Sequence, residues 1–510
     1  MTVALLIIYW LAAAGLFVYG IHCYVLAALY LRHGPEQSQR REAIRKAHAE
    51  SCRDHELPVV TVQLPVFNER FVVERLIDAA LALDWPSTKL QIQVLDDSTD
   101  DTPEIVAAAL ARHGDSGVEL QHLRRSERTG FKAGALAAGL DRSRGELVAI
   151  LDADFVPHPD FLRQCIPFFA DPQVGLVQAR WGHLDRDHSW LTRLQALAID
   201  GHFSVEQAGR CWSGLALNFN GTAGIWRRAA IDDAGGWQGD TLTEDLDLSY
   251  RAQLANWRVE FLVDVEVPAE IPGDIEAFKS QQRRWAKGST QTAVKLLGRV
   301  WRSQWSFGRK CAATLHLTHY GVHPLMLIMA LAAPAVLSLW SGDLGPLAFA
   351  AVALLLLMGA AGPSTLYVVA QRSLHRNWRR RLLDMPLLMV VGCGIAVSNG
   401  RAVFSGLFGS RGTFVRTPKR SLTDAPQSGV SDGYRLPLDP IFLVEGALAL
   451  YTAWGLSLYL AKGQWFVGPF LALYALGFAV VSVCSAREVL AGLIRSKNSG
   501  VSPSVERNET

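Results

Sequence analysis

Long apolar runs stand at both ends of the chain, with a more polar region between them. Residues 3–31 are almost wholly apolar, and further apolar blocks lie at about 314–340, 345–370, 440–461 and 464–486. A helix that crosses a bilayer needs about 20 such residues. The first run is too long for a signal peptide, so we interpret it as a retained helix. The pattern predicts one transmembrane helix before the central region and four after it.

Basic residues next to these runs predict an orientation, because positively charged flanks stay in the cytoplasm. Basic stretches follow the first run at Arg32–Arg53, separate the middle runs at Arg372–Arg381, and follow Ala486. The apolar stretch 383–409 has basic runs on both sides and carries Asn399. We therefore expect an interfacial or re-entrant helix there, an outside N-terminus and an inside C-terminus.

The central region alternates β-rich and helical patterns. The β-rich runs are 58–67, 90–100, 118–125 and 147–154, and helical patterns cover 71–83, 103–112 and 132–141. This alternation predicts an α/β domain with a doubly wound, Rossmann-like parallel sheet.

These patterns divide the chain into segments. We expect a transmembrane helix at 1–31, a basic cytosolic linker at 32–57 and the α/β domain at 58–295. An interfacial helix at 296–313 and two transmembrane helices at 314–370 follow, and then a basic turn with an interfacial or re-entrant helix at 371–410. The chain should close with a cytosolic loop at 411–438, two transmembrane helices at 440–487 and a cytosolic tail at 488–510.

Composition narrows the classes of partner. Half of the 510 residues are hydrophobic, which indicates that a lipid bilayer is one partner. The net charge is only +2, so we expect no nucleic-acid partner. The seven cysteines form no CxxC pair, and this argues against disulfides and a zinc site.

The candidate chemistry begins at Asp152 and Asp154, which end the run LVAILDAD. Alternate residues of an extended segment point the same way, so both carboxylates could face one Mg²⁺ or Mn²⁺ ion. Alone, such a pair is more typical of a solvated turn.

Other motifs occur with it, in a fixed order along the chain. They are Asp96-Asp97 at a strand end, Lys132 at a helix start, Asn220-Gly221-Thr222 in a glycine-containing loop, Thr243-Glu244-Asp245 before a helix, and Gln281, Arg284 and Trp285 on one helical face. Each also has an ordinary structural explanation, such as an acidic first helical turn or a tryptophan at the membrane interface.

Together, D…DxD…TED…QxxRW and the apolar runs resemble the membrane-integrated family-2 nucleotide-sugar glycosyltransferases of the cellulose-synthase-like branch, which have the GT-A fold. The stretches LDDSTDDT, FNGTAGIWRR and FKSQQRRWAKGS are most similar to the mannan and glucomannan synthase-like group. The resemblance covers roughly residues 55–420.

The resemblance implies roles for these residues in an inverting transfer. Asp245 would be the general base and Glu244 its orienter, while Asp152 and Asp154 would hold Mg²⁺ or Mn²⁺. The nucleotide sugar would contact Asp96, Asp97, Lys132, Asp152 and Arg284, and the acceptor would contact Asn220, Thr222, Gln281 and Trp285.

The segment FVRTPK, Phe414–Lys419, resembles the gating loop of cellulose synthase, with Arg416 in place of its valine. Through this resemblance Thr417 and Lys419 would reach the diphosphate. A proline-containing basic linker is the other interpretation.

We therefore expect an inverting β-hexosyltransferase that extends a glucan or (gluco)mannan chain from UDP-glucose or GDP-mannose and exports it through its helices. We place it in the inner (plasma) membrane with the catalytic domain in the cytoplasm. Candidate sugar platforms along the export path are Trp301, Trp305, Tyr320, Trp340, Tyr367 and Trp454. The alternatives are a ceramide-type lipid glycosyltransferase and a non-enzymatic secretion component, the latter disfavoured by the intact motifs.

Overall fold

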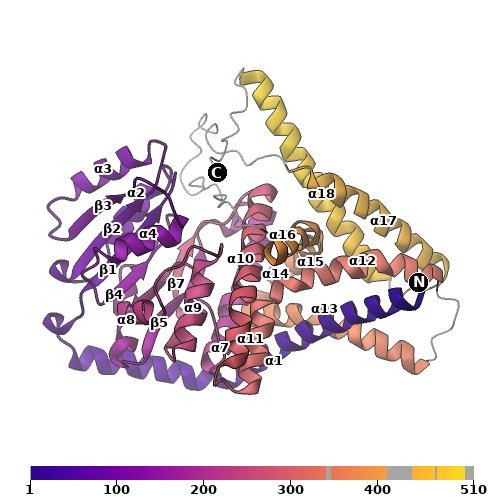
Figure 1. The fold of residues 1–510 in the computed structure, drawn as a ribbon, viewed down its shortest axis with the longest axis horizontal. Coiled ribbons are helices and arrows are strands. Elements are labelled where there is room, and N and C mark those ends of the chain that lie inside the picture. The colour runs from indigo at the N-terminus through magenta and orange to yellow at the C-terminus, as the bar shows by residue number, and fades with distance from the viewer. Residues whose placement is uncertain (1, 340–345, 410–438, 464, 466–467, 500–510) are drawn as a thin grey trace.

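The computed structural model describes residues 2–499 except 340–345, 410–438, 464 and 466–467. Within these residues an α/β domain with a seven-stranded sheet stands beside a bundle of long apolar helices (Figure 1). The strands are β1 (Val60–Val66), β2 (Leu90–Asp96), β3 (Glu119–Arg124), β4 (Leu147–Ile150), β5 (Val174–His183), β6 (Gly224–Arg227) and β7 (Arg258–Ala269).

The sheet order is β3-β2-β1-β4-β6-β5-β7, and it is mixed. The four expected strands are present and pair in parallel, but β6 is antiparallel to both β4 and β5. The expectation of a wholly parallel sheet was therefore wrong. Because β6 runs against β4, the loop that precedes β6 lies at the carboxyl end of β4, beside Asp152.

Short helices cover both faces of this sheet. They are α2 (Val73–Leu81), α3 (Thr102–Arg112), α4 (Phe131–Leu140), α5 (Phe161–Cys165), α6 (Trp190–Gly201), α7 (Ala208–Trp212), α8 (Arg228–Asp233) and α9 (Glu244–Leu254). Alternate strand residues point to opposite faces. In β4, Ala149 therefore packs in one core cluster with α2 and α3, and Val148 packs in another with α4 and α9.

Two further helices, α10 (Ile275–Arg302) and α11 (Phe307–Leu317), join the domain to the bundle. The bundle contains α1 (Thr2–Ser51), α12 (Val322–Leu339), α13 (Pro346–Leu374), α14 (Trp378–Arg381), α15 (Met385–Gly394), α16 (Ala396–Phe408), α17 (Ile441–Ala461) and α18 (Gly468–Ser499). The expected boundary between residues 295 and 296 falls inside α10.

Five of the described helices are long and apolar enough to cross a membrane. They include α1, α12, α13, α17 and α18, which agrees with the expected count. Residues 378–394 and 396–408 form a pair bent by 46°, the geometry of a broken span or a re-entrant loop. The chain is thus a multi-pass membrane protein.

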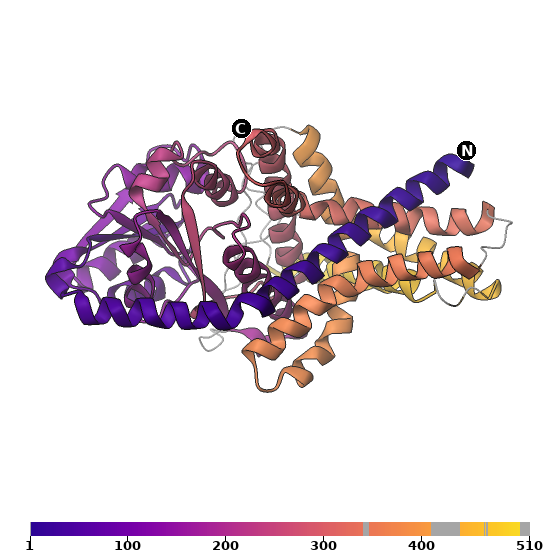
Figure 2. The same ribbon diagram turned by 90° about the horizontal axis from the view of Figure 1, so that it is seen from below.

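Helix α1 does not end at Leu31, where we expected the span to stop, but continues to Ser51. The basic stretch is rich in arginine, alanine and glutamate, which favour helix. This extension runs along the base of the α/β domain (Figure 2). There Arg41 and Arg45 pair with Asp264, at 2.8 and 2.5 Å.

Candidate active site

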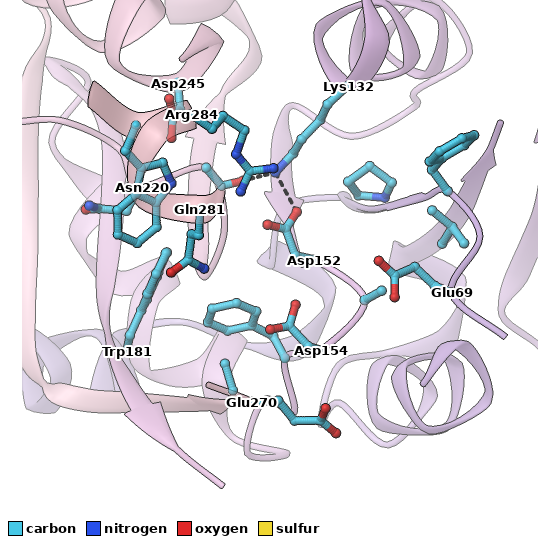
Figure 3. A pocket seen from close by; sticks show the side chains of 18 of the residues that line it. Glu69, Lys132, Asp152, Asp154, Trp181, Asn220, Asp245, Glu270, Gln281 and Arg284 are labelled. Atoms are coloured by element: carbon cyan, nitrogen blue, oxygen red, sulfur yellow. Dashed lines mark hydrogen bonds and ion pairs between the residues drawn. The ribbon is translucent and has the colours of Figure 1, made fainter. Parts of the chain in front are cut away.

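A pocket of about 190 Å³ opens at the carboxyl ends of β1, β2 and β4 (Figure 3). Ligands of open α/β sheets bind at this edge. Most predicted site residues in the described part of the chain line it: Asp97, Lys132, Asp152, Asp154, Asn220, Glu244, Asp245, Gln281, Arg284 and Trp285. Residues almost 190 positions apart in the chain are thus brought to one cavity.

Asp152 sits at the centre of a compact polar arrangement. Lys132, at the start of α4, places its Nζ 2.5 Å from Asp152 Oδ1 and 2.8 Å from the carbonyl oxygen of Gly221. The backbone N–H of Asp152 donates to Thr222 Oγ1 at 2.8 Å. Thr222 is buried behind the wall and holds the backbone of Asp152, whereas we had placed it against the acceptor.

Gly221 brings the loop before β6 close to the charged groups. Its φ of +83° lies in the left-handed region that favours glycine. A Cβ there would stand 3.0 Å from Asp245 Oδ2 and 3.4 Å from Lys132 Nζ. This glycine therefore allows the backbone to approach the pocket.

Asp96, the last residue of β2, and Asp97, which follows it, have different surroundings. Asp97 lines the pocket and receives two hydrogen bonds from Arg125, at 2.9 and 2.5 Å. Asp96 is buried beneath the surface, where it accepts from the Ser98 N–H at 2.8 Å and lies 2.8 Å from His122 Nε2. Asp96 thus shapes the strand end and does not line the pocket.

The carboxylates of Glu244 and Asp245 begin α9 and enter the pocket together. Partial burial, with the neighbouring Glu244 charge, raises the pKa of Asp245 to about 7. Burial also raises the pKa of Glu244, although Lys132 opposes the rise. A carboxyl group with a pKa near neutrality is well matched to taking a proton at physiological pH.

Helix α10 supplies Gln281, Arg284 and Trp285 from one face, as their spacing predicted. The Trp285 ring lies 6.4 Å from that of Trp181, at an interplanar angle of 54°. Burial lowers the pKa of Arg284, while the carboxylates of Glu244 and Asp152 oppose this. An arginine side chain at this position can pair with the phosphate groups of a polyanionic substrate when one binds.

Several lining residues were missed from the sequence: Glu69, Arg128, Trp181, His183 and Glu270. Trp181 and His183 lie on β5 and Glu270 follows β7, two strands that we had not identified. Glu69 follows the first β-rich run, where its charge alone could have singled it out. Thr417 and Lys419 lie outside the described residues.

The carboxylates that line the pocket can be compared with the ligands that the expected metal ion needs. In the described part of the chain, no three His, Cys, Asp or Glu side chains are grouped to hold a metal. Asp152 and Asp154 offer carboxylate oxygens from one wall of the pocket (Figure 3). Two carboxylates fit Mg²⁺ or Mn²⁺ when substrate phosphates and water complete the shell.

Comparison with known proteins defines the class. Residues 58–288 match the family described as "Glycosyltransferase like family 2", and this part of the chain belongs to that family. The resemblance seen in the motifs is thereby confirmed.

Among curated relatives, the chain is 46% identical over 252 residues to glucomannan 4-beta-mannosyltransferase 2 of Arabidopsis thaliana, covering 48% of this chain and 47% of that protein. It is 42% identical over 279 residues to glucomannan 4-beta-mannosyltransferase 1 of Oryza sativa subsp. japonica, covering 54% and 53%. The chain thus spans about half the length of the curated relatives it matches.

A solved structure is also similar: the mannosyltransferase PcManGT from Pyrobaculum calidifontis, in complex with GDP-Man and Mn²⁺. The TM-score is 0.46 at 23% identity, and the match covers 76% of this chain and 99% of that one.

Proposed function

We propose that the protein is a membrane-embedded inverting β-mannosyltransferase that extends a mannan or glucomannan chain from GDP-mannose. The observation that carries this proposal is the convergence of Lys132, Asp152, Asp245 and Arg284 on one pocket. The identity of 46% and 42% to proteins named glucomannan 4-beta-mannosyltransferases favours mannose over glucose as the sugar transferred.

The charged groups suggest how transfer proceeds. Asp245 takes the proton of an acceptor hydroxyl as its oxygen attacks the anomeric carbon, and the bond from that carbon to the diphosphate breaks. Lys132 and Arg284 pair with the diphosphate that departs. A divalent ion held by Asp152 and Asp154 would neutralise part of the same charge. One displacement inverts the anomeric centre, so an α-linked donor gives a β-linkage.

The membrane helices support export of the product. Tyr320, directly before α12, is nine-tenths buried and packs in one cluster with Trp285. One turn further into α12, His323 Nε2 lies 3.0 Å from Asn399 Nδ2 of α16. Polar side chains inside a bundle mark a path for hydrophilic cargo. Of the other expected platforms, Trp301 and Trp454 are exposed, and Trp340 lies outside the described residues.

The basic flanks of the spans favour an inner (plasma) membrane protein whose catalytic domain faces the cytoplasm. This side of the membrane is where nucleotide sugars would reach the pocket.

The test is transfer by the full-length protein in liposomes with Mg²⁺ or Mn²⁺, from radiolabelled GDP-mannose and UDP-glucose separately. We expect a high-molecular-weight product from GDP-mannose that β-mannanase degrades. A product that extracts into organic solvent and carries one sugar would establish a lipid glycosyltransferase instead. Incorporation from UDP-glucose alone would contradict the proposed donor.

A further inference from the structure

Two residues of one unusual helical segment hold the side chain of Asn220, which lines the pocket. Between α6 and α7 the chain forms a π-helix, His202–Gln207. Gln207 Nε2 donates to Asn220 Oδ1 at 2.7 Å, and Asn220 Nδ2 lies 3.1 Å from His202 Nε2. Both ends of the Asn220 amide are therefore engaged from one side.

The π-turn makes this double contact possible. In an α-helix of 3.6 residues per turn, two residues five apart point in directions about 140° apart. In a π-helix, whose wider turn closes hydrogen bonds between residues five apart, such residues point much more nearly in the same direction. His202 and Gln207 are five apart, so the π-turn aligns them on the face that meets Asn220. Single π-turns are rare and concentrate at functional sites.

The hydrogen bonds fix the direction of each group. Gln207 Nε2 also donates to the carbonyl oxygen of Asn218 at 2.8 Å, so its nitrogen faces two oxygens. Asn220 therefore turns Oδ1 toward Gln207 and Nδ2 toward His202. Because Nδ2 can only donate, His202 Nε2 must be the acceptor and His202 Nδ1 must carry the proton. That proton points at Glu206 Oε2, 3.0 Å away.

Glu206 is in turn held by Arg210, a side chain only 1% exposed. Arg210 Nε and Nη2 lie 3.1 and 3.0 Å from Glu206 Oε1, and Nη2 lies 3.0 Å from His22 of α1. Burial alone would raise the pKa of Glu206, but Arg210 and His202 hold it well below its usual value. The charged carboxylate thus keeps the His202 ring in one tautomer and orientation.

We propose that His202 and Gln207 are positioning residues that aim the Asn220 amide at a sugar hydroxyl of the polysaccharide acceptor. The proposal rests on the proposed function. An asparagine amide has two N–H donors and two acceptor lone pairs, and the two clamping contacts use one of each. Among the described residues no further partner of this amide is found. One donor and one acceptor remain, the complement of a hydroxyl group.

The location supports recognition next to the reacting centre. Asn220 directly precedes Gly221. A Cβ atom added to Gly221 would stand 3.0 Å from the Oδ2 atom of the proposed base Asp245. A site built to hydrogen-bond a hydroxyl rejects analogues that lack it, because its polar groups are then left unpaired. The two contacts that His202 and Gln207 make with the Asn220 side chain, together the Asn220 clamp, therefore favour acceptors that carry this hydroxyl group.

The test uses the full-length protein in detergent, GDP-mannose with Mn²⁺, and β-1,4-linked mannohexaose as acceptor. His202→Leu removes the acceptor nitrogen, and we expect it to raise the acceptor KM about tenfold, the effect of a lost hydrogen bond of about 1.4 kcal/mol. The kcat and the Kd for GDP-mannose should stay as in the wild type. His202→Gln, whose amide oxygen can accept from Asn220, should restore most of the KM.

A double-mutant cycle separates positioning from general loss of structure. If His202 acts through Asn220, then His202→Leu with Asn220→Ala should be no worse than Asn220→Ala alone. His188→Leu, at an exposed histidine, is the matched control and should change nothing. Additive effects in the cycle, an unchanged KM for His202→Leu, or an equal loss of GDP-mannose binding would overturn the clamp.

The proposed function fails in a different way. If the wild type binds GDP-mannose but transfers mannose to no oligosaccharide, the function is wrong and the clamp, as an acceptor device, falls with it. If the wild type transfers and the cycle is additive, only the clamp is wrong.

Discussion

Helix α10 carries two cations five positions apart, Lys279 and Arg284, in opposite kinds of surroundings. Lys279 is completely buried, and its Nζ lies 3.0 Å from Glu445 Oε2 and 3.2 Å from Ser485 Oγ, on the last two spans. Arg284 lines a cavity beside Glu244 and other carboxylates that exceed the cations there. The buried ion pair of Lys279 holds helices together, whereas the charged groups that line the pocket around Arg284 are placed to bind a ligand.

The same contrast separates the side of α10 that faces the helical bundle from the side that faces the pocket. At the membrane side, Glu488 of α18 accepts the N–H groups of Ile275 and Glu276, at 2.9 and 3.2 Å, and so caps the start of α10. These contacts fix the helix that presents Gln281, Arg284 and Trp285. We therefore expect changes on the pocket side to alter chemistry, and changes on the membrane side to alter stability.

The strongest test of this division is Asp245→Asn. It removes the proposed base and keeps the shape of the side chain, so transfer should fall by about 10²- to 10⁴-fold. The Kd for GDP-mannose, measured by calorimetry, should not change. Asp115→Asn, at an exposed loop position, is the control for this substitution. Loss of GDP-mannose binding in Asp245→Asn would contradict the role of base.

On the membrane side, Glu445→Ala removes the nearer carboxylate partner of the buried Lys279 and leaves only Glu276, whose Oε1 lies 3.4 Å from Lys279 Nζ. Breaking a buried pair in this way costs about 3–5 kcal/mol, so the apparent Tm in detergent should fall sharply. Lys279→Met combined with Glu445→Leu should recover much of the loss, because both fully buried charges of the pair are then absent. An intact Tm with lost transfer in the folded Glu445→Ala protein would break the comparison.

A smaller effect is expected from Asp152→Ala. Losing one charged ligand of the proposed ion should weaken Mn²⁺-dependent binding of GDP-mannose about ten- to hundredfold. The measurement is the Kd for GDP-mannose across a Mn²⁺ titration. An unaltered dependence on Mn²⁺ would argue against Asp152 as a ligand.

The subtlest expectation is a pH profile. Asp245 must be deprotonated to act as a base, so kcat/KM should rise as pH increases through about 7. Glu244→Gln removes a negative charge that raises the pKa of Asp245, so the rise should move to lower pH. A shift to higher pH in this variant would mean that Glu244 acts on Asp245 by another route.

Much of the pocket could be predicted because its residues follow elements with clear patterns. Asp97 and Asp152 follow buried strands, and Gln281, Arg284 and Trp285 share one helical face. The short strand β6 has only four residues, Gly224–Arg227, too few to show a period. Its antiparallel direction, which brings Asn220 to the pocket, could not be predicted either.

Contacts that depend on tertiary geometry also escaped prediction. Trp181 enters the pocket from β5, and Glu270 enters after β7, so neither could be placed before those strands were known. The alignment of His202 with Gln207 depends on a π-turn, and these five-apart residues match neither an α-helical nor a strand period. Likewise, nothing in the sequence marks Asp96 as buried and Asp97 as open to the pocket.

Helix α1 runs from the apolar bundle to the α/β domain as one continuous helix, which contains Pro35 and changes direction along its course (Figure 2). Its 50 residues correspond to a length of about 75 Å. One end lies against α13, where the backbones of Gly20 and Gly359 touch, and the other is pinned to Asp264 by Arg41 and Arg45. The position of the catalytic domain relative to the apolar bundle is thus set in part by one helix that belongs to both.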